Sequence, residues 1–555
     1  MPERALASSP VAPSAPAGAP VAKGRAGRRG PLRDATTKAG TGGSSYWLET
    51  LGCPKNQVDS DKLGGMLETE GYRRAGRPED ADLLVVNTCA FIDAAREESI
   101  GVVLELAEAK KPGAELTVTG CLAERFGPEL AAAMPEVDRV AGFGVPLHAG
   151  EGARFGQPVR LLATKGRHSG VPSGPGPRAG AAGGRATGPG VEGDEKKIPG
   201  FDLLNLPRPP ARAPWAYVKV AEGCDRKCGF CAIPSFRGPQ RSRAAREILA
   251  EVEGLDAQEI VLVAQDLVSW DRDLTGPARK SPGGAGDGAE DVEGLVGLVR
   301  AVRGRVQRVR LLYLYPSGLS AELVEAIGES GCPYFDLSLQ HVSAPLLRRM
   351  RRFGSAERFL EKIAVIRQRF PEAALRSSFI VGYPGETEQD HDALLRFLEE
   401  AQLDWVGFFA FSLEDGTYAA GLPGRVPAEL VAERLRECSE LQDAITARQR
   451  AGLVGTICQV LVDAPGRARS HREAPEIDGV IRVPRHLAVG SWVRVEVVDA
   501  VGPDLVAAPL GGRAQRLHDW AHQGGQPGEL REDTQRPGRP GSGLAGNLLA
   551  GVQGV

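Results

Sequence analysis

The sequence predicts three folded parts: an α/β domain with a parallel sheet, a partial barrel of six β/α units, and a small all-β barrel. Three observations lead to this prediction. Apolar strand-like runs alternate twice with helical patterns, short Val-rich strands follow near the end, and stretches rich in Gly and Pro separate the parts. With 555 residues, 42% of them hydrophobic, the chain is long enough for several cores.

The segments between and around these parts have a biased composition. Residues 1–44 and 513–555 are rich in small residues, Pro, Gly or Gln, residues 161–205 repeat the bias, and a shorter Gly-rich stretch at about 275–290 resembles a loop insertion. Such segments cannot bury enough apolar surface to fold alone. We therefore expect two disordered tails, a linker and an inserted loop.

The first folded part, residues 45–160, places a cysteine after each predicted strand. Three apolar runs, separated by helical patterns, predict parallel strands at Tyr46–Leu51, Leu83–Val86 and Glu115–Thr119. The cysteines that follow them are Cys53, Cys89 and Cys121. Because the carboxyl ends of parallel strands share one edge of a sheet, these thiols should converge. The alternative is three unrelated buried thiols that pack as small hydrophobes.

The second part, residues 206–448, contains six strand candidates separated by helical segments. They are Tyr217–Val220, Ile260–Ala264, Val309–Tyr315, Phe335–Leu339, Ser377–Val381 and Val406–Phe411. Six such units predict an open relative of the eight-fold β/α barrel, with its site at the carboxyl-end face. The third part, residues 449–512, has short alternating strands from Ile457–Val462 to Leu505–Ala508, which predict a small β-barrel.

A compact cysteine loop follows the first barrel strand. Cys224, Cys228 and Cys231 form a C-x3-C-x2-C pattern with Phe230 before the last cysteine. Three thiolates on one loop can hold three corners of an iron–sulfur cubane and leave the fourth iron open. A structural zinc site would need a fourth protein ligand, and no nearby His or Cys supplies one. The polar neighbours of the loop also disfavour a buried-core role.

This loop and the barrel pattern resemble the radical S-adenosylmethionine superfamily. The resemblance implies a [4Fe–4S] cluster on the three loop cysteines and S-adenosyl-L-methionine as the source of a deoxyadenosyl radical. Gln265, at the end of one barrel strand, and Gly382, in a Gly-Tyr-Pro-Gly-Glu turn after another, occupy positions where such enzymes contact the cofactor. A glycine turn also suits any tight βα loop.

The segments around the first three cysteines resemble the methylthiotransferase family of that superfamily. They read Leu-Gly-Cys-Pro-Lys-Asn-Gln-Val-Asp-Ser (51–60), Asn-Thr-Cys-Ala-Phe-Ile-Asp (87–93) and Thr-Gly-Cys-Leu-Ala-Glu-Arg (119–125). The resemblance implies that Cys53, Cys89 and Cys121 hold a second, auxiliary [4Fe–4S] cluster, and that the last part is a TRAM-like barrel. One departure is Ser338, where the family usually has proline, which affects any role for Gln340 and His341.

The Cys-Pro-Lys-Asn segment and residues 473–479 resemble the corresponding segments of one group of enzymes in this family. Those enzymes methylthiolate the β-carbon of an aspartate in the twelfth protein of the small ribosomal subunit. Residues 451–512 hold six Arg, no Lys and seven acidic residues. A barrel that gripped tRNA should be basic, whereas a near-neutral barrel with an acidic loop suits a basic ribosomal protein. The alternatives are a tRNA adenosine methylthiotransferase and a zinc-stabilised scaffold that binds ribosomes.

The bulk composition bounds the partners and the compartment. A net charge of −3 disfavours a chain built mainly to neutralise phosphates, so we expect no stable nucleic-acid binding. No apolar run approaches the roughly 18 residues of a membrane helix. The nine cysteines and the lack of a signal segment indicate the cytoplasm. The family resemblance implies a flavodoxin- or ferredoxin-type reductant.

The sequence assigns no single role to two further groups of residues. Arg237, Arg241 and Arg243 crowd the segment after the cysteine loop, where they either meet an acidic substrate carboxylate or form a solvated basic loop. The remaining cysteines have no companion motif, so they are expected to be ordinary core or surface thiols: Cys332, Cys438 and Cys458.

Overall fold

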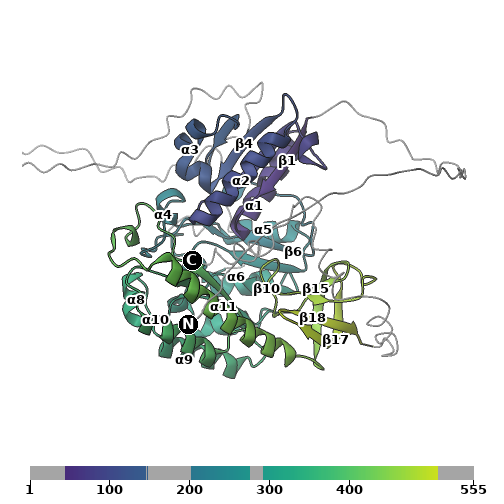
Figure 1. The fold of residues 1–555 in the computed structure, drawn as a ribbon. Helices are drawn as coiled ribbons and strands as arrows, with labels where there is room; N and C mark the ends of the chain where they lie inside the picture. The colour runs from purple at the N-terminus through teal and green to yellow at the C-terminus, as the bar shows by residue number, and fades with distance from the viewer. Residues whose placement is uncertain (1–43, 146, 148–201, 275–291, 511–555) are drawn as a thin grey trace, which may run out of the picture. The chain divides into compact units, whose positions relative to one another are not determined.

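The computed structural model describes residues 44–145, 147, 202–274 and 292–510 (Figure 1). The two expected tails except Ser44, most of the expected linker and the expected loop insertion lie outside the described residues. The end of that linker is folded, because Leu203–Asn205 forms a short 3-10 helix with Leu204 buried. Among the helices of the described residues, none combines the length and the apolar character needed to cross a membrane.

The first domain contains a five-stranded parallel sheet in the order β2-β1-β3-β4-β5, which confirms the predicted parallel architecture. Its strands are β1 (Ser45–Thr50), β2 (Arg73–Arg74), β3 (Leu83–Thr88), β4 (Glu115–Gly120) and β5 (Arg139–Ala141). The two edge strands β2 and β5 were not predicted, since two or three residues are too few to show a strand period. The three central strands are those followed by cysteines.

Helices cover both faces of this sheet: α1 (Pro54–Thr69) on one, α2 (Asp93–Ala109) and α3 (Cys121–Ala133) on the other. The alternation along β3 explains the arrangement. Val85 packs in one cluster with Leu63 of α1, whereas Val86 packs in another with Val103 of α2. Successive strand residues point to opposite faces, so an apolar run buried on both sides needs helices on both sides.

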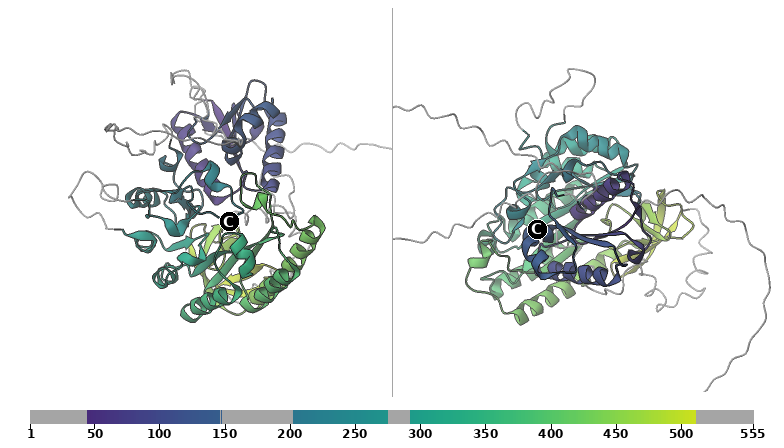
Figure 2. Two further views of the ribbon diagram at one scale, coloured as in Figure 1. Left: turned by 90° about the vertical axis from the view of Figure 1, so that its left-hand side faces the viewer. Right: turned by 90° about the horizontal axis from the view of Figure 1, so that it is seen from above.

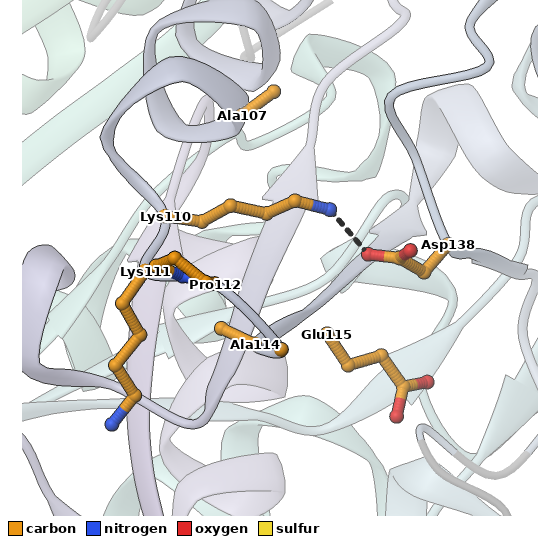
Figure 3. Close-up of a pocket in the computed structure, with 8 residues that line it drawn as sticks. Ala107, Lys110, Lys111, Pro112, Ala114, Glu115 and Asp138 are labelled. Atoms are coloured by element: carbon orange, nitrogen blue, oxygen red, sulfur yellow. Dashed lines mark hydrogen bonds and ion pairs between the residues drawn. The ribbon is translucent and has the colours of Figure 1, made fainter.

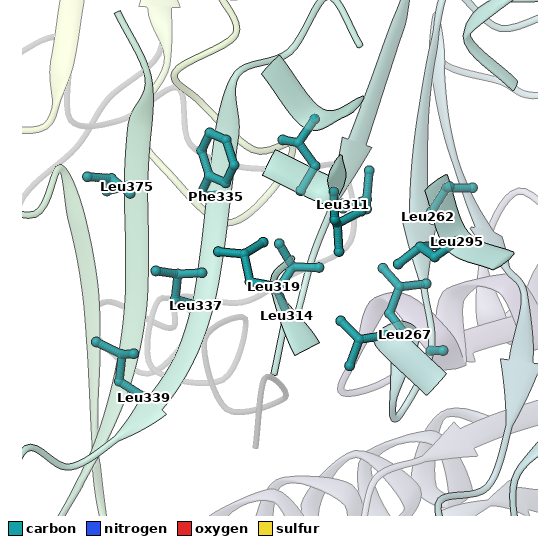
Figure 4. Packing of buried hydrophobic residues seen from close by; sticks show 14 of the residues in the cluster. Leu262, Leu267, Leu295, Leu311, Leu314, Leu319, Phe335, Leu337, Leu339 and Leu375 are labelled. Carbon is teal, nitrogen blue, oxygen red and sulfur yellow. The ribbon is translucent and has the colours of Figure 1, made fainter. Parts of the chain in front are cut away.

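The second domain is the expected open barrel of six parallel strands, in two three-stranded sheets joined by a bridge between Leu314 and Leu337. The strands are β6 (Trp215–Lys219), β9 (Glu259–Val263), β10 (Arg308–Leu311), β11 (Tyr334–Gln340), β12 (Ala374–Val381) and β13 (Trp405–Ala410). Figure 4 shows part of the leucine-rich core that these strands share with neighbouring helices. Strand β10 ends four residues before the predicted Tyr315, because Tyr313 has a φ of 65° and interrupts the strand.

The barrel helices are α5 (Ala245–Gly254), α6 (Gly294–Arg303), α7 (Ala321–Gly328), α8 (Ala344–Arg349), α9 (Ala356–Arg369), α10 (Glu388–Ala401) and α11 (Ala428–Ala451). The segment after β6 carries the cysteine loop, the short helix α4 (Ile233–Phe236) and the paired strands β7 (Ala221–Glu222) and β8 (Arg241–Ser242). These short elements fix the loop at the carboxyl end of the first barrel strand, as predicted.

The third domain is a closed five-stranded barrel in the order β14-β15-β16-β18-β17 (Figures 1 and 2). Its strands are β14 (Ile457–Ala464), β15 (Arg467–Arg469), β16 (Ile481–Arg482), β17 (Trp492–Val501) and β18 (Asp504–Pro509). Its interior is small and aliphatic, with Val460, Val495 and Leu505 among the buried residues. The predicted β-barrel is confirmed.

Two of the three carboxylates in the expected acidic loop of this barrel, residues 473–479, are engaged inside the protein. Glu473 is buried and accepts a hydrogen bond from Arg450 at 2.5 Å. Asp478 accepts from the Tyr334 hydroxyl at 2.6 Å. Both carboxylates therefore fasten the small barrel to the larger one, and Glu476 is the acidic residue of this loop that faces solvent.

Candidate functional site

The three strand-end cysteines of the first domain lie together at the carboxyl edge of the sheet. Cys53 caps the N-terminus of α1, Cys89 follows β3 and Cys121 opens α3. The Sγ atoms of Cys53 and Cys121 lie 3.8 and 3.9 Å from the same Asn56 Oδ1. Cys89 is within electrostatic reach of both other thiols. Three adjacent strands thus deliver three buried thiols to one place.

Asn56 and Gly120 hold these loops in position. The Asn56 Nδ2 donates to the carbonyl oxygens of Leu51 at 2.9 Å and Thr88 at 3.0 Å, which ties the first cysteine loop to the second. Gly120 has a φ of 89°, and a Cβ there would lie 2.3 Å from Asn87 Oδ1. Only glycine allows the third loop to approach the second this closely.

The second triad lines a cavity at the carboxyl face of the barrel. Cys224 is buried, and Cys228 and Cys231 are half-buried. The cavity is lined by Cys224, Arg226, Cys228, Cys231, Ile233, Pro234, Gln265, Asp266, Tyr313, Tyr315, Ser338 and Arg352. Tyr315 lies between two guanidinium groups, Arg226 at 3.8 Å and Arg352 at 3.9 Å from the ring centroid. Thiols, amide, carboxylate and cations therefore converge on one small space.

The chemistry of both triads fits an iron–sulfur cluster. Burial raises the pKa of Cys121, and it raises the pKa of Cys224 to about 12. Such thiols stay protonated unless a strong positive charge compensates their burial, and a bound metal deprotonates a coordinating thiol outright. A cubane would engage the three thiols of each triad and leave its fourth iron open.

Arg237 connects the two triads. Its Nη2 donates to Asn56 Oδ1 at 2.8 Å and to Cys121 Sγ at 3.0 Å, and its Nη1 donates to Glu222 Oε1 at 2.9 Å. The Gln265 Nε2 donates to the same Glu222 oxygen at 2.6 Å. Although burial opposes it, the positive charge of Arg237 lowers the pKa of Glu222 well below its ordinary value. A buried polar chain therefore runs from the barrel cavity to the auxiliary triad.

This geometry corrects the expectation for the three arginines after the cysteine loop. Arg237 is buried against protein groups and is not available to a substrate carboxylate. Arg241 pairs with Asp202 at 2.8 Å, and Arg243 pairs with Glu251 at 2.6 Å. None of the three belongs to a solvated basic loop, because each has a carboxylate partner inside the protein.

Gln265 and Gly382, the two residues predicted to contact the cofactor, lie in different places. Gln265 lines the cavity, and its Oε1 has no hydrogen-bond partner within the described part of the chain, so it is poised to accept from a ligand. Gly382 does not line the cavity. Its N–H donates to Glu386 Oε2 at 2.6 Å, and a Cβ at its φ of 85° would lie 2.5 Å from Val431 Cγ2. Gly382 shapes the turn between β12 and α10.

Lys55 and Tyr313 are site residues that the sequence analysis missed. Tyr313 lines the same cavity as the second triad of cysteines. The Nζ of Lys55 lies 4.1 Å above the centroid of the Tyr313 ring. Burial raises the pKa of Tyr313 well above its ordinary value, and burial lowers the pKa of Lys55. The sequence feature that could have pointed to them is the position of Lys55, a charged residue two positions after Cys53.

A second pocket lies on the surface at the turn between α2 and β4 (Figure 3). It is open, and its main polar contact is an ion pair between Lys110 Nζ and Asp138 at 2.6 Å. No cysteine lines it. Of the cysteines without a motif, Cys332 and Cys438 are buried and Cys458 is half-buried, as expected for ordinary thiols.

Comparisons with known proteins agree with this organisation. Residues 45–142 match the model "Uncharacterized protein family UPF0004", residues 218–398 the radical SAM superfamily, and residues 454–510 the TRAM domain. The relative "Ribosomal protein uS12 methylthiotransferase RimO" of Saccharopolyspora erythraea is 39% identical over 84% of this chain and 95% of its own length. The protein of that name from Streptomyces coelicolor is 38% identical over 86% and 98%. A solved radical S-adenosylmethionine methyltransferase, TsrM from Kitasatospora setae, is 15% identical, covers 80% of this chain and 84% of its own, and has a TM-score of 0.38.

An open β/α barrel with a C-x3-C-x2-C loop at its carboxyl face, together with the match to the radical SAM superfamily model and to the curated relatives, defines a radical S-adenosylmethionine enzyme. The auxiliary triad and the closing TRAM barrel narrow that class. The chain belongs to the RimO family of ribosomal protein uS12 methylthiotransferases.

Proposed function

We propose that this chain is a radical methylthiotransferase that modifies the β-carbon of an aspartate in uS12, the twelfth protein of the small ribosomal subunit. The observation that carries the proposal is the chain of contacts from Gln265 through Glu222 and Arg237 to Cys121. These hydrogen bonds link the cavity beside Cys224, Cys228 and Cys231 to the auxiliary triad. A sulfur insertion needs both a radical and a sulfur source at one carbon atom.

Each triad has a separate task in this proposal. Cys224, Cys228 and Cys231 hold the [4Fe–4S] cluster next to S-adenosyl-L-methionine, and Cys53, Cys89 and Cys121 hold the auxiliary [4Fe–4S] cluster. When bound, these groups supply the electron, the radical, the sulfur and the methyl group. Gln265 accepts a hydrogen bond from the cofactor through its unsatisfied Oε1. Apolar wall residues of the cavity, Ile233 and Pro234, help to keep water away.

The small barrel supports a protein substrate over tRNA. Three of its six arginines are neutralised by carboxylates of the same chain, since Arg469 pairs with Asp463, Arg472 with Asp404 and Arg482 with Asp504. The exposed charges are balanced, with three arginines against three carboxylates at Arg467, Arg485, Arg494, Glu476, Glu496 and Asp499. A phosphate-binding surface requires a clear excess of cations.

The remaining parts of the proposal concern context. We assign residues 45–160 to the auxiliary-cluster domain, 206–448 to the radical domain and 449–512 to the TRAM-like barrel. The electron comes from a flavodoxin- or ferredoxin-type protein, and the reaction takes place in the cytoplasm, where uS12 is made and assembled.

Mass spectrometry of uS12 and of tRNA nucleosides, from cells with and without this gene, tests the substrate. We expect the aspartate modification to disappear from uS12 while methylthio groups on tRNA persist. Intact uS12 modification would refute the proposal, and loss of methylthio groups from tRNA would replace it with the tRNA activity.

Iron analysis of anaerobically purified protein tests the two sites. The wild type should hold about eight irons, two cubanes of four. Replacing Cys53, Cys89 and Cys121 by Ala should leave about four, together with cleavage of S-adenosylmethionine but no methylthio transfer. Replacing Cys224, Cys228 and Cys231 should also leave about four but abolish cleavage. Iron content unchanged in either variant would rule out that cluster site.

A further inference from the structure

Tyr313 has a strained backbone at the edge of the cavity. Its φ of 65° is rare for a bulky aromatic residue, and its N–H donates to Asp336 Oδ2 at 3.0 Å. Strain of this kind persists only where the surrounding structure enforces it, and it gathers at ligand sites. The conformation interrupts β10 and turns the Tyr313 ring toward the cysteine loop, where it lines the cavity.

The hydroxyl of Tyr313 is buried and unsatisfied. The residue is 4% exposed, and its OH has no hydrogen-bond partner within the part of the chain that the structure describes. Buried hydroxyl groups nearly always have a partner, so an exception calls for a physical reason. A ligand atom that enters the cavity would supply the missing partner.

Tyr313 also reaches from one triad to the other. Its ring lines the cavity with Cys224, Cys228 and Cys231, and its hydroxyl lies within electrostatic reach of Cys53. Lys55, which is 6% exposed, places its Nζ 4.1 Å above the centre of the same ring. A phenol and an amine, both buried, therefore mark the region between the two triads.

We propose that the Tyr313 hydroxyl and the Lys55 side-chain nitrogen bind the carboxylate of the target aspartate. This inference rests on the proposed function and deepens it, because it names the groups that select the substrate side chain. A carboxylate only accepts hydrogen bonds, and both groups donate them. Binding the carboxylate beside Cys53 would hold the adjacent β-carbon between the triads.

The same pair explains how the site would discriminate. A site built to hydrogen-bond one group rejects an analogue that lacks it, because a buried polar group of the site, here the Tyr313 hydroxyl, is then left unpaired. An asparagine in place of the target aspartate keeps the shape but removes the charge and one acceptor oxygen. Its amide N–H groups would face the donors of Tyr313 and Lys55.

The test measures binding of two substrates to three enzymes. Wild type, Tyr313→Phe and Lys55→Met, all cluster-loaded and anaerobic, are titrated with labelled uS12 that carries either its target aspartate or asparagine, and fluorescence anisotropy gives each dissociation constant. We expect the wild type to prefer the aspartate form by about tenfold or more, since tenfold corresponds to about 1.4 kcal/mol. Each variant should lose most of that preference by weakening only the aspartate form.

Matched controls keep the test sharp. Tyr72→Phe removes a hydroxyl from a half-buried tyrosine after α1, and Lys110→Met removes a surface amine (Figure 3), so both should retain the full preference. Iron content and absorbance spectra are compared for all five proteins. Loss of iron in Lys55→Met would show that Lys55 serves the auxiliary cluster, which would overturn its carboxylate role and leave Tyr313→Phe to decide the hydroxyl.

Two outcomes separate this inference from the proposed function. If the wild type binds and modifies uS12 with an aspartate preference that Tyr313→Phe and Lys55→Met retain, the carboxylate site is refuted and the methylthiotransferase assignment stands. If the wild type neither binds nor modifies uS12 while cleaving S-adenosylmethionine, the proposed function fails, and this inference falls with it.

Discussion

The Arg237 guanidinium donates from 3.0 Å to the Sγ of Cys121, so a side chain of the radical domain contacts a predicted cluster ligand of the first domain. The contact is fully buried and is shared with Asn56 and Glu222. Hydrogen bonds to cluster sulfurs and nearby charge are among the factors that set a reduction potential. Arg237 therefore joins the domains, and we expect it to affect the reduction potential of a cluster held by Cys121.

Arg237→Met should shift the reduction potential of the auxiliary cluster to a more negative value, because the added electron loses a nearby positive charge. A tenfold change in the one-electron equilibrium corresponds to about 59 mV. The potential is measured by EPR-monitored redox titration in a background that lacks Cys224, Cys228 and Cys231, so that only the auxiliary cluster contributes. Arg237→Lys should restore part of the shift.

Arg241→Met is the matched control, since the guanidinium of Arg241 pairs with Asp202 and not with a triad cysteine. Its potential should equal that of the parent. A potential unchanged in Arg237→Met would reduce Arg237 to a structural link between the domains.

A single methyl group at Gly120 should disrupt the auxiliary site. In Gly120→Ala the new Cβ would lie 2.3 Å from Asn87 Oδ1 and 2.5 Å from the Thr88 carbonyl oxygen. Gly113→Ala provides the control, because Gly113 has a similar φ of 83° but nothing within 4 Å of its Cβ position. Both substitutions carry about 1–3 kcal/mol of backbone strain.

Only Gly120→Ala adds the steric clash, so we expect it to unfold at lower urea concentration than Gly113→Ala and to lose about half of its iron. Urea unfolding and iron analysis give the two readouts. Equal stability and equal iron content in the two variants would show that the close approach of these loops is unimportant.

The sequence predicted that the three cysteines of each triad lie together, because each triad shows a local signal. In the first domain the cysteines follow strand ends, and in the second they share one short loop. The role of Arg237 could not be predicted, since its partners Asn56 and Cys121 are separated from it by 181 and 116 residues. Tyr313 was missed for a different reason. It read as part of a continuous strand, and a backbone forced to positive φ by tertiary contacts leaves no trace in hydrophobic periodicity.

Glu259→Gln should destabilise the attachment of the small barrel. The Glu259 carboxylate is fully buried and accepts from Arg310 at 2.8 Å, from Arg469 at 3.2 Å and from Arg308 at 3.3 Å. Although burial opposes it, the charge of Arg469 and then of Arg310 lowers the pKa of Glu259 to about 2. Removing one partner of a buried charge network costs roughly 3–5 kcal/mol.

Urea unfolding and limited proteolysis between α11 and β14 measure this loss. Glu496→Gln, at an exposed site on β17, should change stability by less than about 0.5 kcal/mol. Wild-type stability in Glu259→Gln would mean that the three arginines are satisfied by other groups.

His341 should make the stability of the enzyme depend on pH. The ring is buried, its Nδ1 accepts from the Ser343 N–H at 3.1 Å, and burial lowers the pKa of His341 from 6.5 to about 4. The folded protein therefore holds a neutral ring, as expected for a structural hydrogen bond. Between pH 6.5 and 4 the unfolded chain binds the proton more readily, so this contribution is complete above pH 6.5 and is lost as the pH falls toward 4. Its full size is on the order of 3 kcal/mol.

Urea unfolding from pH 5 to 8 measures this dependence. The stability of the wild type should rise with pH more steeply than that of His341→Asn. The control His486→Asn, at an exposed site, should keep the wild-type slope. Identical slopes in wild type and His341→Asn would mean that the buried ring does not titrate in this range. The pH dependence would then have to come from other groups such as the half-buried His471, whose pKa desolvation also lowers to about 4.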